Sequence, residues 1–222
     1  IDLNINNSLN LWESIKFKWN KINEDSQELS LYLKFPYFLN SNLSLITNFN
    51  LLQFENTYIN RKLVSSLELV KKIYSIELGY IDERSSIINN FNNSFIKDYK
   101  KKSILFNSKI YKKNIFDLMD FSFTNNYDFG LKKIEDENEI CQKLSQNLFF
   151  SIPIFSKVYL DISYSNDFII GKNILDNEKI GVGGADQMRG FLENSFFSKH
   201  INVLNLENKY YLIITHMFPF SL

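Results

Sequence analysis

An alternating run begins at Leu43 and reads Leu43-Ser44-Leu45-Ile46-Thr47-Asn48-Phe49-Asn50-Leu51. Its odd positions are mostly apolar and its even positions mostly polar, which is the period-two pattern of a β-strand with one apolar face. The stretch 29–35 alternates in the same way. Because this period recurs along the chain, the sequence predicts an all-β protein.

The same pattern predicts ten strands. Several are longer than the roughly 5 to 6 residues usual in soluble sheets and reach the roughly 9 to 11 that a tilted strand needs to cross a membrane. The predicted ranges are 9–19, 29–35, 43–51, 61–70, 73–81, 102–111, 116–131, 143–152, 157–168 and 202–214. We therefore expect an antiparallel up-and-down transmembrane β-barrel.

The connections between these strands support that topology. Longer or more polar segments, at 20–26, 55–60, 82–101, 132–142 and 171–201, alternate with tighter turns at 36–42, 71–72, 112–115 and 153–156. Long loops outside and short turns on the periplasmic side are typical of such barrels. Helix-like spacing at 134–148 and at 88–99 leaves a short helix beside an outer loop as an alternative for each segment.

The composition describes a folded chain with no charge-driven partner. Among 222 residues, 25 Lys and Arg balance 25 Asp and Glu, so the formal net charge of zero gives no support for nucleic-acid binding. Hydrophobic residues make up 45%, which is too much for a disordered chain. Nowhere does the chain have the run of about 18 apolar residues that would predict a transmembrane helix.

The sequence offers little for catalysis or metal binding. Cys141 is the one cysteine, and the histidines are His200 and His216, so neither a disulfide nor a Cys/His metal cluster is expected. No Ser/His/Asp arrangement or pair of catalytic carboxylates can be inferred. We expect no enzymatic activity, no metal and no cofactor. Cys141 reads as inert, and the charge runs 100–102 and 135–137 read as solvated loop ends.

A glycine-rich segment near the C-terminal end stands apart. It reads Gly183-Gly184-Ala185-Asp186-Gln187-Met188-Arg189-Gly190-Phe191, and four of the seven glycines fall between Gly181 and Gly190. Glycine at such density predicts positive φ angles or close approach to another surface. No Gly-Lys-Ser/Thr follows, so a phosphate-binding loop is not supported.

This segment resembles the Gly-Gly-x-x-x-(Leu/Val/Ile)-Arg-Gly-(Phe/Tyr) motif of the bacterial surface-antigen barrels. That superfamily contains the BamA/TamA-type outer-membrane assembly factors and the FhaC-like secretion pores. The flanking residues 177–180, 193–198 and 206–210 look like the variants of the Bacteroidota branch. Two positions depart from the pattern, because Met188 replaces the usual aliphatic residue and Lys209 stands where an arginine is more usual.

The resemblance implies that residues 1–222 are one outer-membrane barrel domain, in which 171–201 is the sixth extracellular loop, folded into the barrel. The ten predicted strands would then be the third to twelfth of a probable sixteen. On that count further strands, and periplasmic POTRA modules before Ile1, are expected outside the chain, so we expect a fragment.

Within that loop, the resemblance makes Arg189 the latch that fixes the tip. A guanidinium inside a barrel is costly to bury unless carboxylates or carbonyls accept its hydrogen bonds. In the family the acidic partner lies on a later strand, and Glu207, which shares a face with Asn205 and Lys209, is the local candidate. A solvated surface arginine is the alternative.

The remaining motif residues are expected to support the tip. Gly183, Gly184 and Gly190 would let the backbone approach the barrel wall, and Phe191 would pack against that wall as an apolar plug. Ordinary turn glycines and a core phenylalanine are the alternative.

Three functions remain open. The first is a β-barrel of the Gram-negative outer membrane that assembles, inserts or translocates other proteins. Its partners would be membrane lipid, client outer-membrane or secreted proteins, and periplasmic or lipoprotein accessory subunits, with no nucleic acid. The second is an FhaC-like two-partner secretion pore. The third is a passive porin or a soluble β-sandwich, in which the Arg-Gly-Phe tip would be accidental.

Overall fold

The structure is a computed structural model that describes residues 1–8, 10–22, 24–89, 95–115, 119–155, 158–184, 188, 190–192 and 194–210. Its strands are β1 (Asp2–Asn6), β2 (Ser14–Lys21), β3 (Gln27–Phe35), β4 (Leu43–Phe54), β5 (Tyr58–Val70), β6 (Tyr74–Ile87), β7 (Tyr99–Ile115), β8 (Met119–Ile134), β9 (Glu137–Phe155), β10 (Val158–Gly171), β11 (Ile180–Val182), β12 (Phe196–Ser198) and β13 (His200–Tyr210). Two short 3-10 helices, η1 (Phe38–Asn40) and η2 (Asp176–Glu178), complete the fold. Within these ranges no helix has the length and apolar character needed to cross a membrane.

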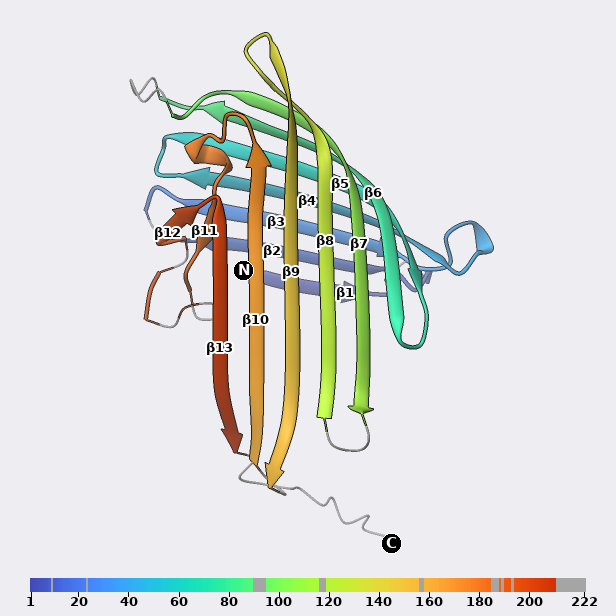
Figure 1. The fold of residues 1–222 in the computed structure, drawn as a ribbon. Helices are drawn as coiled ribbons and strands as arrows, with labels where there is room; N and C mark the ends of the chain where they lie inside the picture. The colour runs from blue at the N-terminus through green and yellow to red at the C-terminus, as the bar shows by residue number, and fades with distance from the viewer. Residues whose placement is uncertain are drawn as a thin grey trace, which may run out of the picture.

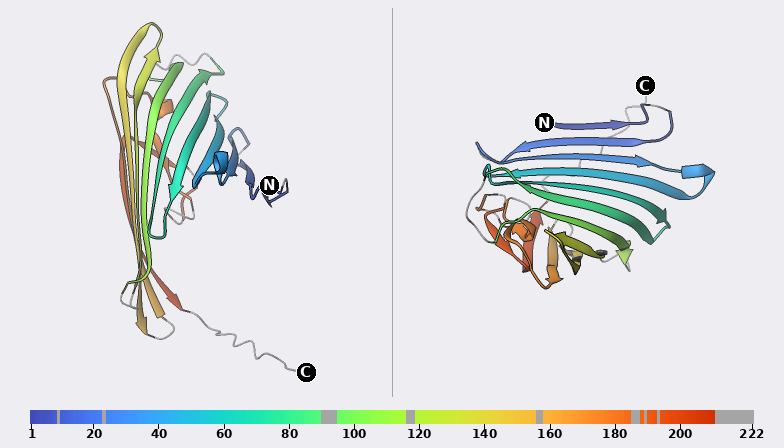
Figure 2. Two further views of the ribbon diagram at one scale, coloured as in Figure 1. Left: turned by 90° about the vertical axis from the view of Figure 1, so that its right-hand side faces the viewer. Right: turned by 90° about the horizontal axis from the view of Figure 1, so that it is seen from above.

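Eleven of the strands form one antiparallel sheet in the order β1 to β10 followed by β13. Each strand pairs with its predecessor in the sequence, except that β13 pairs with β10 across the segment that contains β11 and β12. The strands run up and down in turn (Figure 1), and from above the sheet curves into an open arc whose edges are β1 and β13 (Figure 2). This confirms the predicted all-β, up-and-down barrel wall. A sandwich of two packed sheets is not what the described strands form.

All ten predicted strands are present, as β2 to β10 and β13. The pattern missed β1, because its five residues are too few to show a reliable period. Several connections are shorter than predicted, and two examples are 55–57, which joins β4 to β5, and the pair Glu135 and Asp136, which joins β8 to β9. In both places the backbone pairing continues through polar residues that the sequence pattern assigned to loops.

The helical alternative for 134–148 is wrong. Ile134 ends β8, and the remaining residues belong to the 19-residue strand β9. Of the second segment, residues 90–94 lie outside the described residues, and Tyr99 begins β7.

The two faces of the sheet have opposite polarity. The convex face carries exposed apolar side chains on neighbouring strands, among them Leu63, Leu67, Leu78, Ile104, Phe106 and Phe129. The concave face carries charged and polar side chains, many of them buried, among them Ser66, Ser85, Lys101, Asp128, Lys132 and Asp161. A soluble sheet would bury its apolar face, so this inverted arrangement is that of a barrel wall with a polar interior.

Candidate functional site

The connection between β10 and β13 folds onto the concave face of the sheet (Figures 1 and 2). It carries η2 and a small antiparallel ribbon in which Ile180 pairs with Ser198 and Val182 with Phe196. The ring of Phe197 in this ribbon meets Phe54 of β4 edge-on, with 5.2 Å between centroids. The inward-folded segment predicted at 171–201 therefore has described contacts with the wall.

Asn177 is one anchor of this segment. Its side chain is 2% exposed, and its amide donates to Ser85 Oγ at 2.6 Å and to the Lys97 carbonyl at 2.8 Å. In return, the backbone carbonyl of Asn177 accepts a hydrogen bond from the Asn60 side chain at 2.7 Å. These bonds join η2 to β5, to β6 and to the chain just before β7.

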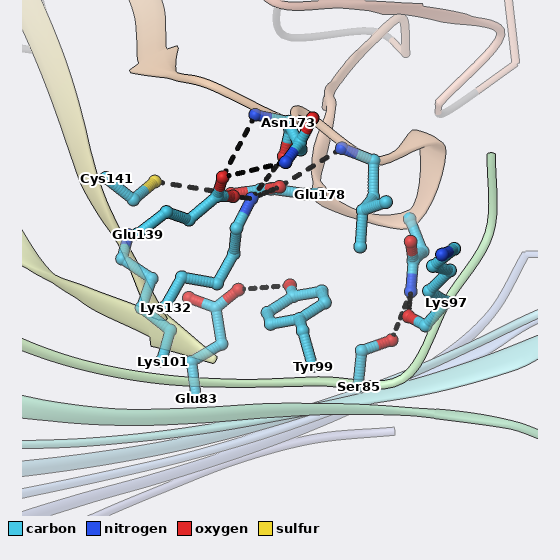
Figure 3. Close-up of polar contacts among 12 residues, drawn as sticks. Glu83, Ser85, Lys97, Tyr99, Lys101, Lys132, Glu139, Cys141, Asn173 and Glu178 are labelled. Carbon is cyan, nitrogen blue, oxygen red and sulfur yellow. Dashed lines mark hydrogen bonds and ion pairs between the residues drawn. The ribbon is translucent and has the colours of Figure 1, made fainter. Parts of the chain in front are cut away.

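Lys132 of β8 is the second anchor, and its side chain is completely buried. Its ammonium lies 2.6 Å from Glu178 Oε2, 2.7 Å from Glu139 Oε1 and 2.5 Å from the Asn173 carbonyl (Figure 3). The contacts with Glu178 and with the Asn173 carbonyl are hydrogen bonds, and the contact with Glu139 is an ion pair. A buried charge is tolerated only when it is paired and bonded in this way.

The two carboxylates of this cluster are themselves held in place. Glu178 also accepts the Leu175 N–H at 3.2 Å and the thiol of Cys141 at 3.3 Å. Glu139 accepts both the backbone N–H and the side-chain amide of Asn173, at 3.2 and 3.1 Å. We call Lys132, Glu139, Asn173, Asn177 and Glu178 the loop-docking site.

Strand register explains why the wall half of the site is so highly charged. Across β5 to β9, Lys62 pairs with Glu83, Glu83 with Lys101, Lys101 with Lys132, and Lys132 with Glu139. These five side chains form one charged row on the concave face. Neighbouring strands lie about 4.8 Å apart, so each charge lies next to another. Two residues of the row have further partners: Glu83 accepts a hydrogen bond from the Tyr99 hydroxyl at 2.6 Å, and Lys101 forms an ion pair with Asp128 at 2.8 Å.

One expectation from the sequence fails here. Lys101, assigned to a solvated loop end, is buried and ion-paired on the concave face. The sequence pattern missed this because the strands continue past the apolar alternation into charged residues. Cys141, expected to be inert, is fully buried, and its thiol donates to a carboxylate of the docking site.

The motif glycines have left-handed backbone angles, as their density predicted. Gly183 has φ +142°, and a Cβ there would overlap the Leu192 carbonyl oxygen. Gly184 has φ 88° and pairs with Met188 in an isolated bridge. Gly190 has φ 91°, but nothing lies within 4 Å of a Cβ built there. Its need for glycine comes from the backbone angle rather than from close approach to the wall.

Phe191 contacts its own segment. Phe191 is half exposed, and its described ring contact is with Phe196 of the same segment, at 5.1 Å between centroids, not with the wall. Arg189 lies outside the described residues. The latch assigned to it remains a prediction.

Glu207 lies where the alternation placed it. It pairs in register with Asp161 and shares the half-buried side of β13 with Asn205, while Leu204 and Leu206 are exposed. Lys209, which shares a face with Glu207, forms an ion pair with Asp161. Whether Glu207 meets Arg189 stays a prediction, because Arg189 is outside the described part of the chain.

A cavity of about 430 Å³ continues along the concave face from the charged row. Lys62, Glu68, Glu77, Asp128 and Lys143 line it, together with asparagines of β4 and β8 and with apolar side chains such as Ile46, Val64 and Leu105. The lining therefore mixes charged and apolar groups. Within the described ranges, no group of three or more His, Cys, Asp or Glu residues could hold a metal ion.

The residues that dock the loop were not singled out by sequence reasoning. Asn177 and Glu178 were noted only as flanks of the glycine motif, and Lys132 and Glu139 were assigned to a loop. One signal could have revealed them: charged residues recur at equivalent register in successive strands, as in Arg61-Lys62, Glu83-Arg84, Lys100-Lys101 and Lys132-Lys133.

Comparison with known proteins gives a fold and no family. No protein-family model and no curated protein sequence matches the chain. Among solved structures, the outer-membrane expressed OmpT of Vibrio cholerae is similar, with a TM-score of 0.51 and 10% sequence identity over 89% of this chain and 60% of that one. At this identity the likeness concerns the fold alone, and the chain spans 60% of that protein's length. The described sheet is therefore an antiparallel wall section of the kind found in outer-membrane β-barrels.

Proposed function

We propose that this chain forms part of a Gram-negative outer-membrane β-barrel that assembles, inserts or translocates other proteins, with the segment 171–201 docked inside as a releasable plug. The observation that carries the proposal is the loop-docking site. Asn177 and Glu178 are buried against residues of several wall strands, on the concave face of a sheet whose convex face is apolar and exposed.

The polarity of the two faces supports a membrane location. Leucine, isoleucine and phenylalanine side chains spread over the outside of β5 to β9 would be costly in water and favourable against lipid chains. The concave face, with its charged row, needs water or polar partners. A bilayer around the sheet and an aqueous lumen within it satisfy both requirements.

The chemistry of the docking site supports a plug that can leave. An apolar loop packed on an apolar wall would be held by burial alone. Here ion pairs and hydrogen bonds, whose partners are rehydrated when they separate, supplement apolar contacts such as that of Phe197 with Phe54, so burial alone does not hold the segment. A barrel that passes or inserts polypeptides needs such an exchange between a closed and an open lumen.

The resemblance at 183–191 is what directs the proposal to protein assembly rather than to solute passage. It implies that a client hairpin adds to an exposed strand edge by β-augmentation, without ATP. The same resemblance includes FhaC-like secretion pores, so translocation of a dedicated exoprotein is the second form of the proposal.

The test uses the full-length protein reconstituted in vesicles. We expect the protein to show a heat-modifiable gel shift and to stay in the membrane when the vesicles are extracted with aqueous solution. We also expect it to accelerate folding of an unfolded barrel client or transport of an exoprotein. Acceleration of client folding supports assembly, and transport without it supports the secretion form. Free ion conductance with neither activity would assign a passive porin and refute the proposal. Extraction into the aqueous phase would refute the membrane location itself.

A further inference from the structure

Four basic side chains form a second row, on the convex face at the end of the sheet nearest the docked segment. Register pairs Arg61 with Arg84, Arg84 with Lys100, and Lys100 with Lys133, on the adjacent strands β5 to β8. All four residues are exposed. At about 4.8 Å between strands, this basic row is roughly 14 Å long.

The basic row and the charged row occupy neighbouring positions in the chain. Successive side chains of a strand point to opposite faces, so the pairs Lys100-Lys101 and Lys132-Lys133 each place one cation inside and one outside. The inner members, Lys101 and Lys132, are buried and paired with carboxylates. The outer members face away from those carboxylates and need other partners.

Acidic residues near the basic row compensate only part of its charge. Arg84 pairs with Asp82 at 2.9 Å, and Lys133 lies 3.4 Å from the fully exposed Asp136.

Two further acids, Asp98 and Glu135, line the same surface depression of about 360 Å³ as the four cations. Asp98 accepts the Ile87 N–H at 2.7 Å, and Glu135 pairs with Lys97 at 3.0 Å. Arg61 donates to the neutral Ser86 Oγ at 3.3 Å. Four cations and two carboxylates line the depression, so its lining has more positive than negative charge.

The basic row lies at the edge of the apolar part of the convex face. Toward the opposite end of the sheet, the next row contains Leu63 and Leu131, with Asp82 and Lys102 between them. The row after that contains Tyr80, Ile104 and Phe129, all exposed. Cations that border a mixed row and then an exposed apolar band are arranged as the boundary between lipid chains and headgroups requires.

We propose that the basic row binds the phosphates of an anionic lipid headgroup in the leaflet that meets the long-loop end of the barrel. This inference rests on the proposed function, because it requires the convex face to lie in a bilayer. Arginine forks and lysine ammoniums are the side chains that bind phosphate best, and two arginines and two lysines in one row can share a headgroup that carries two phosphates. The lipid would then fix the height of β5 to β8 in the membrane.

The experiment measures lipid preference at the protein surface. Full-length protein is reconstituted in phosphatidylcholine vesicles that contain spin-labelled lipid A with two phosphates, and the immobilised fraction gives a relative association constant. We expect wild type to prefer lipid A to spin-labelled phosphatidylcholine. Each cation near an anionic lipid surface accounts for about a fivefold change in affinity, so K100Q/K133Q should reduce the preference roughly 25-fold. The quadruple variant R61Q/R84Q/K100Q/K133Q should abolish it.

The matched control is K71Q/K72Q, which removes two exposed lysines from the turn between β5 and β6 at the opposite end of the sheet. Its preference should stay within twofold of wild type, and the heat-modifiable gel shift confirms that each variant is folded. Unchanged preference in folded K100Q/K133Q overturns the inference and leaves the membrane barrel standing. Displacement of lipid A by inorganic phosphate at equal phosphate concentration would assign a free-phosphate site and also overturn it. A protein that fails to enter pure phosphatidylcholine vesicles would refute the proposed function instead.

Discussion

Replacing Lys132 by Met should release the docked segment from the barrel wall. In wild type the ammonium is 0% exposed, and the side chains of its partners Glu178 and Glu139 are 5% and 10% exposed. Removing the cation leaves two carboxylates close together and buried, and breaking a buried ion pair in this way costs about 3 to 5 kcal/mol. At about 1.4 kcal/mol per tenfold change, docking should weaken by roughly 10² to 10³·⁵.

The chain contains its own reporter of docking. Cys141 is the one cysteine, is 0% exposed, and lies under Glu178 with its thiol 3.3 Å from a carboxylate oxygen. Its cross-strand neighbours are Gly130 and Gly171, which have no side chains to shield it once the segment leaves. The labelling rate of this thiol by a hydrophilic maleimide should therefore follow the undocked population.

We expect K132M to be labelled at least 100 times faster than wild type. K133M is the matched control, because Lys133 is adjacent in sequence but exposed on the other face, and its labelling rate should not change. The triple variant K132M/E139M/E178M should regain protection, since apolar residues of similar volume can replace a buried ion cluster without loss. The heat-modifiable gel shift shows whether K132M is folded. If folded K132M is labelled within threefold of the wild-type rate, the claim that Lys132 compensates the two buried carboxylates is refuted.

Three further predictions concern the segment and the wall. N177A loses two hydrogen bonds, to Ser85 and to the Lys97 carbonyl, and should be cleaved about tenfold faster between 172 and 199 in limited proteolysis. G130A would push a Cβ into the backbone of β7 and should lower the temperature of the heat-modifiable transition by several degrees, from about 1 to 3 kcal/mol of overpacking. G171A is its control and should change nothing, because a Cβ there meets only ordinary contacts at 3.7 Å or more. R189A should loosen the segment and reduce client assembly; unchanged assembly together with unchanged protease resistance would contradict the latch assigned by resemblance.

The strands could be predicted because the apolar alternation lies on the exposed convex face and is not disturbed by packing from a second layer. Leu43 to Leu51 is one example, in which every odd position points outward. The ends of the strands could not be predicted in this way. Beyond the apolar band, hydrogen bonds between neighbouring strands continue through Lys132, Lys133 and Glu137. Apolar and polar residues do not alternate there, so the sequence pattern gives no sign of a strand.

The loop-docking site could not be predicted from the sequence pattern, for a related reason. Glu178 is 46 residues from Lys132 in the chain, and Asn177 is 92 residues from Ser85. Their contact depends on the curvature of the sheet, which no local pattern encodes. The glycine-rich motif drew attention to the correct segment, but the residues that contact the wall flank it: Asn177 and Glu178 lie before it and Phe197 after it.

The separation of these contacts along the chain has a consequence for assembly. Every wall strand except β13 pairs with the strand that precedes it, so the wall can grow hairpin by hairpin. The bonds that hold the segment inside join residues as far apart as Asn60 and Asn177, and they need at least β5 to β9 already in place. Loop closure over such distances is slow compared with hairpin formation. Docking should therefore be the last folding step, and a newly formed barrel should pass through a hydrated, open-lumen intermediate before Lys132 is desolvated.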